Sequence, residues 1–457
     1  MEGKVRIMLD KKFVDKVLAY GREKGLKDME LYYSDSEELT MKVFDGEIDN
    51  YSVSKSGGVS FRTHYAEKMG YAYTEKLDDF SVQFLVDNAM DNALIIDSDD
   101  EERIFEGAGE YKTRDNKIDL EDRSTQEDKI QGMLEMESMA KNMDSRIQKV
   151  QYCVYGELIV KSKIVNSKGL DLCHQANLAY TYLGVVAKEG EEIKTGMSYR
   201  VGEKFTDLDT KAIAKEAVEE AIAMLGASSV KSGDYPVIIK NNAAADLLEA
   251  FSSVFSAENA QKDLSLLKGK IGDKIAVDDL NIIDDPHMEK GFSTRFFDDE
   301  GFPTKRNEIV KDGVLKTYMH NLKTAKKSGI ESTGHASRGS YKSSIGISPT
   351  NFYFEPGKLN LDQMIMEMSK GLVIIDLQGL HSGLNPVSGD FSLSCYGYYV
   401  EEGKIVKPVN QITVSGNFFQ LLKNIERIGS DLKFTLPSNA YIGSPSIWIQ
   451  NLSIAGE

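Results

Sequence analysis

The chain has 457 residues, of which 41% are apolar and 28% are charged, as is usual for a globular protein long enough for two or three domains. Its 55 basic and 72 acidic residues give a net charge of −17, which disfavours binding to nucleic-acid backbones and to anionic membrane surfaces. The sequence has no apolar run of spanning length, no signal-like N-terminal core and only three cysteines, Cys153, Cys173 and Cys395. We therefore expect a cytoplasmic protein with neither a nucleic-acid nor a membrane partner.

The first hundred residues predict a helix, an antiparallel meander and a second helix. Apolar residues form a helical stripe over 12–24, and a second stripe covers 78–94. Between them we expect four or five short strands, divided by turn-like residues at 45–46, 57–58 and 67–68. These strands lie near 29–34, 39–44, 50–55, 58–63 and 69–74.

The next segment predicts a charged connector, a long helix and a second group of strands. The connector covers 97–116, and the helix covers 118–143. Strands are expected at about 150–164, 170–187 and 194–203, followed by a helix over 208–225. Ser-Gly-Asp-Tyr-Pro at 232–236 is the best domain boundary, because small and turn-forming residues gather there.

After this boundary the pattern changes to short strands separated by Gly, Asn, Asp, Ser and Pro. A strand at 236–240 and a helix over 243–262 come first, and a further helix is expected near 361–369. The sequence thus predicts an α+β protein. Its N-terminal α/β domain covers 1–232, with the connector and long helix at 97–148, and a β-rich, barrel-like antiparallel domain covers 233–457.

Spacing motifs for a metal are missing from the sequence. No two of the six histidines lie within five residues of each other, and no cysteine pair has zinc-ribbon spacing. The acidic run Asp298-Asp299-Glu300 resembles a cation site, although exposed acidic turns of this kind are usually only solvated. A metal site assembled from distant residues stays open.

A nucleophile is equally hard to find. Cys395 follows His381 by fourteen residues, and a thiol with a histidine is a known catalytic pair. We favour the simpler interpretation of Cys395 as a small buried residue on one face of a strand. Ser52-Val53-Ser54-Lys55 matches an S-x-x-K pattern, but it lies in a predicted strand and turn where such a match arises by chance.

Two polar, glycine-rich loops of the second half are candidates for binding. One covers 332–340 and contains His335 and Arg338; the other covers 381–391 and contains Asn385 and Asp390. Long loops on a β scaffold often carry binding groups, but the same residue types also serve tight turns.

Three blocks of the second half resemble the TldD/PmbA peptidase family, once called modulators of DNA gyrase. They lie at 297–336, 383–409 and 428–456, and they include the runs Phe-Asp-Asp-Glu-Gly, Gly-Leu-Asn-Pro-Val-Ser-Gly-Asp-Phe and Ile-Gly-Ser-Asp-Leu. The N-terminal runs at 44–48 and 57–59 are also similar to the family.

The resemblance implies that a catalytic branch of the family carries H-E-x-x-x-H on the helix after the first strand of the second domain, with a further cysteine ligand near the C-terminus. Here the equivalent helix reads Leu248-Glu249-Ala250-Phe251-Ser252-Ser253, so Leu248 and Ser253 stand at both histidine positions and only Glu249 is kept. Residues 434–446 contain no cysteine. Leucine and serine cannot replace imidazole as zinc donors.

The chain is therefore expected to be similar to the PmbA or TldE-like branch, without a catalytic metal of its own. The resemblance implies a heterodimer with a TldD-like subunit that carries zinc, acting on peptides or unfolded proteins. The loop residues His335, Arg338, Asn385 and Asp390 are our candidates for lining the substrate cleft. Two alternatives stay open: a homodimeric peptide-binding scaffold, and a hydrolase with an unrecognised site.

Overall fold

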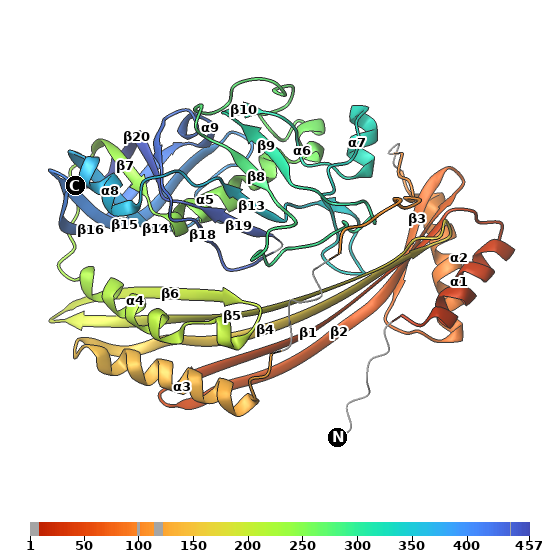
Figure 1. The fold of residues 1–457 in the computed structure, drawn as a ribbon, viewed down its shortest axis with the longest axis horizontal. Coiled ribbons are helices and arrows are strands. Elements are labelled where there is room, and N and C mark those ends of the chain that lie inside the picture. The colour runs from red at the N-terminus through yellow and green to blue at the C-terminus, as the bar shows by residue number, and fades with distance from the viewer. Residues whose placement is uncertain (1–8, 98–100, 114–121, 439) are drawn as a thin grey trace.

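A long, curved antiparallel sheet forms the first domain of the computed structural model, which describes residues 9–97, 101–113, 122–438 and 440–457 (Figure 1). Its six strands are hydrogen-bonded in the order β3-β2-β1-β4-β5-β6. Their bounds are β1 Met29–Phe44, β2 Glu47–Tyr65, β3 Lys68–Thr74, β4 Ile147–Asn166, β5 Asp171–Glu189 and β6 Glu192–Gly202.

Two pairs of helices cover the two ends of this sheet. Helices α1 (Lys11–Glu23) and α2 (Asp79–Ile95) pack at one end, and α3 (Gln126–Met143) and α4 (Thr210–Ala223) pack at the other (Figure 1). Each begins at a residue whose side chain accepts a hydrogen bond from the first turn, which satisfies a backbone N–H that the helix cannot. These capping residues are Asp10, Asp78, Thr125 and Asp209.

The short strands predicted in the first domain are wrong, because the meander has three strands and two of them are long. The chain turns at Asp45-Gly46, where both residues have positive φ, but Gly57 and Gly58 lie inside β2. A Cβ on Gly58 would lie 2.5 Å from the ring of Tyr341. This glycine therefore serves close packing against the second domain rather than a turn.

The second domain combines a barrel with a smaller sheet. Strands β16 (Lys404–Asn417), β15 (Asp390–Glu401), β14 (Lys370–Gln378), β7 (Gly233–Ile239) and β20 (Ile447–Ala455) follow one another, and pairing of β16 with β20 closes them into a barrel. Strand β17 (Ile425–Ile428) pairs antiparallel with β20. The prediction of an α+β fold with a barrel-like second domain is confirmed.

The smaller sheet has the order β10-β9-β8-β13-β19-β18. Its strands are β8 Ile282–Asp284, β9 Asn307–Lys311, β10 Val314–Leu315, β13 Asn351–Phe354, β18 Lys433–Phe434 and β19 Tyr441–Ser444, and a two-stranded pair is formed by β11 Ala336–Ser337 and β12 Gly346–Ile347. The short helices of this domain are α6 Ala257–Gln261, α7 Leu322–Ser328, α8 Leu361–Glu367 and α9 Phe418–Leu421. The sequence predicted only α8 of the last three.

Helix α5 (Asn241–Phe251) lies between the barrel and the smaller sheet, and its apolar side enters the main core. The single helix predicted over 243–262 is wrong in its length. After Phe251 the chain continues as the 3-10 turn Ser252–Phe255 and then as α6. Ser252 Oγ donates to the carbonyl of Glu249 at 2.8 Å, and such local bonds compete with the helical ladder.

The two domains pack together at both ends of their contact. At one end Tyr32, Ile164 and Leu170 of the long sheet form an apolar cluster with Tyr341 of the second domain. At the other end the hydroxyl of Tyr199 on β6 donates to the carbonyl of Phe434 at 2.9 Å. The inner face of the long sheet is thereby fixed opposite α5. Within the described part of the chain, none of the helices has the length and apolarity to cross a membrane.

Candidate functional site

Helix α5 carries the positions at which the resemblance places metal ligands. Leu248 is fully buried in the main core, whereas Ser253 is exposed on the following 3-10 turn. Glu249 is half-buried and accepts a hydrogen bond from Ser438 Oγ at 2.6 Å. Leucine and a surface serine offer no nitrogen donors, so this helix does not fit a zinc ion in the way that the resemblance implies for the catalytic branch. Across the described ranges, no group of three His, Cys, Asp or Glu side chains has the arrangement of a metal site.

A polar cavity of about 350 Å³ adjoins the N-terminal half of this helix. One wall comes from β6 and α4 of the first domain, and the other comes from α5, β14, β15 and β18 of the second. The side chains that carry its charge and hydrogen-bonding groups are Tyr199, Glu216, Glu219, Glu220, Lys240, Asn242, Asp246, Asp376, Tyr396, Tyr398 and Lys433. We call this space the interdomain cavity. Both domains are needed to form it.

Burial disturbs the ionisation of several groups in the interdomain cavity. Burial, with the nearby charges of Asp376 and Glu249, raises the pKa of Asp246 to about 7. Burial also raises the pKa of Asp376. Burial, together with Lys240 and Arg200, lowers the pKa of Lys433 to about 8. Ionisable groups with shifted pKa values in a concave site are typical of binding or catalytic regions.

A second, apolar pocket of about 120 Å³ lies farther along the same interdomain face. Leu158 and Leu178 of the long sheet form one side, and Phe292 and Tyr441 form the other. Ser438, which also holds Glu249, belongs to its wall. The half-buried polar side of α5 therefore lines the charged cavity through Asn242 and Asp246, and its Glu249 is bonded to Ser438 of the apolar pocket.

The sequence did not single out the cavity residues, because no spacing motif joins α4, α5, β14 and β18. One signal was present in the helix itself. Asn242, Asp246, Glu249 and Ser253 follow one another at helical spacing and form the polar side of an otherwise apolar helix.

The loop residues predicted to line a substrate cleft lie in two different places. His335 and Arg338 are buried, 1% and 7% exposed; His335 is bonded within the second domain, whereas Arg338 reaches Glu30 of the first. His335 Nε2 lies 3.0 Å from Asp284 Oδ2, and its Nδ1 lies 2.8 Å from the hydroxyl of Thr333. Both side chains are thus fully engaged in the interior of the chain, and their role toward a substrate stays a prediction.

Asn385 is exposed in the loop between β14 and β15, and Asp390 is exposed at the first position of β15. Asn385 Oδ1 accepts from the backbone N–H of Val387 at 2.9 Å, which closes a tight turn. Asp390 Oδ1 accepts from Asn417 Nδ2 at 2.8 Å, and this bond with one from Ser388 lowers the pKa of Asp390. In the described structure no hydrogen bond or ion pair joins these residues to His335 or Arg338. Their role in a cleft also stays a prediction.

The acidic run at 298–300 is not the solvated turn that the sequence predicts. Asp298, Asp299 and Glu300 are 0%, 8% and 4% exposed. Asp298 Oδ1 accepts from the backbone N–H groups of Glu300 at 2.9 Å and Phe302 at 3.0 Å, which explains how a carboxylate is held there. Burial and the neighbouring Glu300 raise the pKa of Asp298 well above its usual range.

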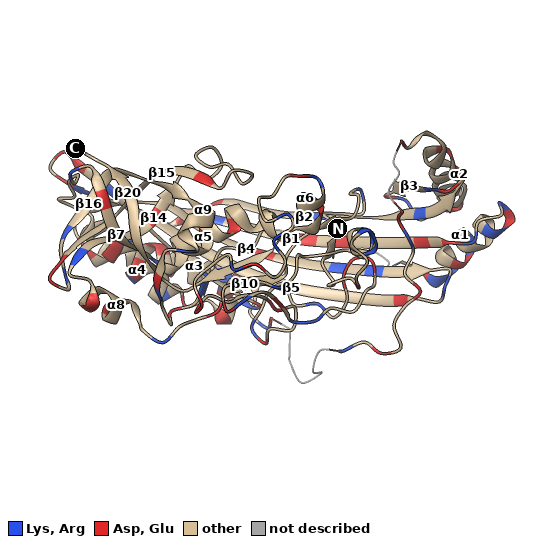
Figure 2. Ribbon diagram, turned by 90° about the horizontal axis from the view of Figure 1, so that it is seen from above, with Lys and Arg blue, Asp and Glu red and all other residues tan. Residues whose placement is uncertain are grey.

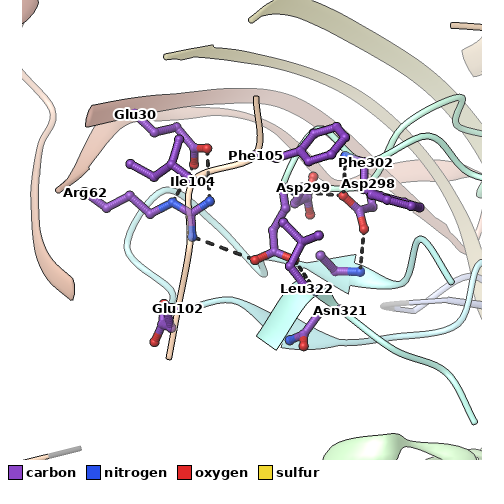
Figure 3. Close-up of polar contacts among 12 residues, drawn as sticks. Glu30, Arg62, Glu102, Ile104, Phe105, Asp298, Asp299, Phe302, Asn321 and Leu322 are labelled. Atoms are coloured by element: carbon purple, nitrogen blue, oxygen red, sulfur yellow. Dashed lines mark hydrogen bonds and ion pairs between the residues drawn. The ribbon is translucent and has the colours of Figure 1, made fainter. Parts of the chain in front are cut away.

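Two arginines compensate this buried acidic region, and Figure 3 shows one of them, Arg62, between Glu30 and the acidic run. Arg62 Nε lies 2.7 Å from Glu30 Oε1, and its Nη1 lies 3.8 Å from Glu300 Oε1. Arg338 Nη2 lies 2.5 Å from Glu30. Residue Ile104 of the connector, 2% exposed, packs beside this network, and the tilted rings of Phe105 and Phe302 lie 5.3 Å apart. Ile104 and Phe105 of the connector therefore pack over the buried network. The network holds the two domains against each other and does not form an open site.

The thiol of Cys395 is buried in β15, as predicted from the sequence. Burial raises its pKa to about 12, so the reactive thiolate is scarcely populated at neutral pH. His381, the histidine considered as a catalytic base for Cys395, is exposed in the loop before β15.

Comparison with known proteins agrees with this architecture along almost the whole chain. Residues 29–93, 119–225 and 232–456 match the families described as PmbA/TldA metallopeptidase domain 1, central domain and C-terminal domain. A solved Thermotoga maritima protein, named for a proposed modulation of DNA gyrase, is 32% identical with a TM-score of 0.89, over 97% of this chain and 100% of that one. The chain belongs to the PmbA/TldD metallopeptidase family.

Two further members of the PmbA/TldD family are informative. An Escherichia coli relative named "Metalloprotease PmbA" is 25% identical over 96% of this chain and 94% of its own length. The solved TldE of Thermococcus kodakarensis is 23% identical and shares the fold with a TM-score of 0.87, over 97% of this chain and all of that one. The membership predicted from the loop motifs is thus confirmed, and the motifs at 297–300 are buried parts of the domain contact.

Proposed function

We propose that this chain is a non-catalytic subunit of a TldD/TldE-type heterodimeric zinc metalloprotease, in which it helps to enclose an extended peptide. One observation carries the proposal: Leu248 of α5 is buried in the main hydrophobic core, and Ser253, on the 3-10 turn after α5, is exposed. A helix that buries leucine at the first motif position uses that position for packing, so zinc chemistry has to come from a partner that keeps the histidines.

The interdomain cavity and the apolar pocket support the part of the proposal that concerns peptides. In this proposal a groove runs from the charged cavity to the apolar pocket along the half-buried polar side of α5, where Glu249 accepts from Ser438 of the pocket wall. An extended chain satisfies such a surface by placing successive side chains into separate pockets. Glu249, held by Ser438, would be a wall residue of that groove and not a general base, because this chain offers no metal-bound water for it to activate.

The test is isolation of the tagged chain from its own host at physiological expression, with the bound proteins identified by mass spectrometry. We expect a stoichiometric relative that carries H-E-x-x-x-H, one zinc ion in the pair, and cleavage of an unfolded protein by the pair but by neither subunit alone. We expect both subunits in the cytoplasm.

Recovery of a homodimer without any such relative would contradict the proposal. It would favour the alternative of a peptide-binding scaffold when no cleavage is seen. Cleavage of the unfolded protein by the purified homodimer, unaffected by a chelator, would favour the alternative of a hydrolase with an unrecognised site.

A further inference from the structure

The interdomain cavity contains carboxylates that form no ion pair within the described part of the chain, although the charges of Lys433 and Lys240 act on two of them, Asp246 and Glu220. Glu216 is paired with Arg200 at 2.5 Å, and Glu219 lies near Lys215. By contrast, Asp246 accepts no hydrogen bond and forms no ion pair with any described residue. A half-buried carboxylate without a partner is costly, because its charge has lost water and gained nothing in return.

Two further carboxylates of the cavity have only neutral hydrogen-bond partners. Glu220 accepts from the hydroxyl of Tyr396 at 3.2 Å, and Asp376 accepts from Gln378 Nε2 at 3.1 Å. Burial raises the pKa of both Asp246 and Glu220, and the charge of Asp376 raises each further, whereas Lys433 lowers the pKa of Asp246 and Lys240 lowers that of Glu220. The three acidic groups come from α4, α5 and β14, so the fold brings like charges together from both domains.

One residue of the cavity lining, Asn242, also has an acceptor without a donor. The Oδ1 atom of Asn242 is buried and accepts no hydrogen bond from any described group. Its amide orientation is fixed, because Nδ2 donates to the carbonyl of Ile375 at 2.9 Å. Buried acceptors of this kind are rare in folded proteins and call for a partner. The missing partner is an N–H or O–H donor.

The lysines of the cavity do not supply this donor. Lys433 lies with its Nζ 4.4 Å from the centre of the Tyr199 ring, and its pKa is lowered by burial and by Lys240 and Arg200. The structure shows no ion pair between either cavity lysine and Asp246, Glu220 or Asp376 within the described ranges. Carboxylates also outnumber lysines in the lining.

We infer that the interdomain cavity binds the cationic side chain of an extended peptide, a lysine ammonium or an arginine guanidinium, with the carboxylates of Asp246, Asp376 and Glu220 as its acceptors. The cavity volume of about 350 Å³ is in the range of sites that enclose small groups. The adjoining apolar pocket would take an apolar side chain of the same peptide. The inference rests on the proposed function only in taking a peptide as the ligand.

The probe is a fluorescein-labelled Ala/Ser peptide of about ten residues with one lysine and, three residues later, one leucine. Two matched peptides replace the lysine with norleucine, which keeps the chain length without the charge, or with glutamate. Binding to the full chain is measured by fluorescence anisotropy at pH 6 and pH 8. We expect the lysine peptide to bind roughly ten- to a hundredfold more tightly than the norleucine peptide, as is usual for charged hydrogen bonds.

Raising the pH from 6 to 8 ionises Asp246 and should strengthen binding of the lysine peptide, while the lysine of the peptide stays charged. The other charged groups near Asp246 act on binding of the lysine peptide in the same direction. Asp376 and Glu249 add negative charge, and Lys433, with a pKa of about 8, loses positive charge as the pH rises toward 8. The norleucine peptide should show no such gain.

Asp246→Asn should abolish the preference for lysine over norleucine, because it keeps the side-chain shape and removes the charge. Asp263→Asn is the matched control, since Asp263 is exposed, pairs with Lys268 outside the cavity and has a positive φ that Asn tolerates. It should keep the preference. A urea titration of each variant shows that it is folded.

Equal or tighter binding of the norleucine or glutamate peptide, retention of the preference in Asp246→Asn, or no binding of the lysine peptide by the full chain would overturn the inference. These outcomes leave the proposed function intact, because the assay uses this chain alone. Failure to recover a zinc-bearing partner would overturn the proposed function without changing the peptide preference.

Discussion

Arg338 of the second domain and Glu30 of the long sheet form a buried ion pair, with 2.5 Å between Nη2 and Oε1. Glu30 accepts from Arg62 of its own sheet at the same time, at 2.7 Å and 3.0 Å. One carboxylate therefore compensates two guanidinium groups, one from each domain. At this point of the domain contact, a single acidic side chain holds an arginine from each domain.

Glu30→Gln should strongly destabilise the protein, because it leaves Arg62 and Arg338 buried with too little negative charge. Removing one partner from a buried ion pair typically costs about 3–5 kcal/mol. We expect a loss of that size in the free energy of unfolding, measured by urea titration. Glu37→Gln is the control, since Glu37 pairs with Lys55 on the exposed part of β1 and should cost less than about 1 kcal/mol. Equal effects of the two substitutions would refute a special role for Glu30.

Leu248 and Ser253 should respond very differently to alanine, although both stand at positions that the resemblance assigns to ligands. Leu248 is 0% exposed, so Leu248→Ala leaves a cavity and should cost about 2–5 kcal/mol of unfolding free energy. Ser253→Ala at the surface should stay within about 0.5 kcal/mol. Urea titrations of both variants measure the difference. A small effect of Leu248→Ala would show that the helix keeps that position for something other than packing.

The sequence predicted the fold class and the helices α1, α2 and α4 of the first domain, because an amphipathic stripe is a local signal. It failed where glycine has a tertiary cause. Gly57-Gly58 has the composition of a turn, yet Gly58 lies in β2 because a Cβ there would collide with Tyr341, more than two hundred residues away in sequence. No local pattern distinguishes the two uses of glycine.

The candidate site shows the same limit. The absence of histidine at the two motif positions could be predicted from the resemblance, because that prediction needs only the residue types at positions 248 and 253. The interdomain cavity could not, because Glu220, Asp246 and Asp376 are brought together only by the packing of the two domains. Charge composition gives no help, since Lys and Arg are interspersed with Asp and Glu over both domains in the described chain (Figure 2).

Asp246 should make the protein less stable as the pH rises. Its ordinary pKa is 3.8, and burial raises the pKa in the folded state to about 7, so the folded protein holds the proton more tightly than the unfolded chain. The resulting stabilisation is present below about pH 4 and is lost as the pH rises through 7. Asp246→Asn removes this dependence without breaking a hydrogen bond to any described residue.

We therefore expect Asp246→Asn to match the natural protein near pH 4 and to exceed it in unfolding free energy at pH 8, by on the order of 1–3 kcal/mol. Urea titrations at the two pH values measure the difference. Asp263→Asn should show no such pH-dependent gain, because Asp263 is largely exposed. A variant less stable than the natural protein at pH 8 would mean that a partner for Asp246 exists in solution.

The three cysteines should separate cleanly by their reaction with iodoacetamide. Cys173 is exposed, whereas Cys153 and Cys395 are buried, and burial raises the pKa of the Cys395 thiol to about 12. Because the thiolate is the reactive form, the native protein at pH 8 should be modified only at Cys173, and urea should expose all three. Intact mass and peptide mapping measure the modification, and Cys173→Ser should leave the native protein unmodified. Rapid labelling of Cys395 in the folded protein would instead support a hydrolase that uses this thiol, since a catalytic thiolate has to be accessible and ionised.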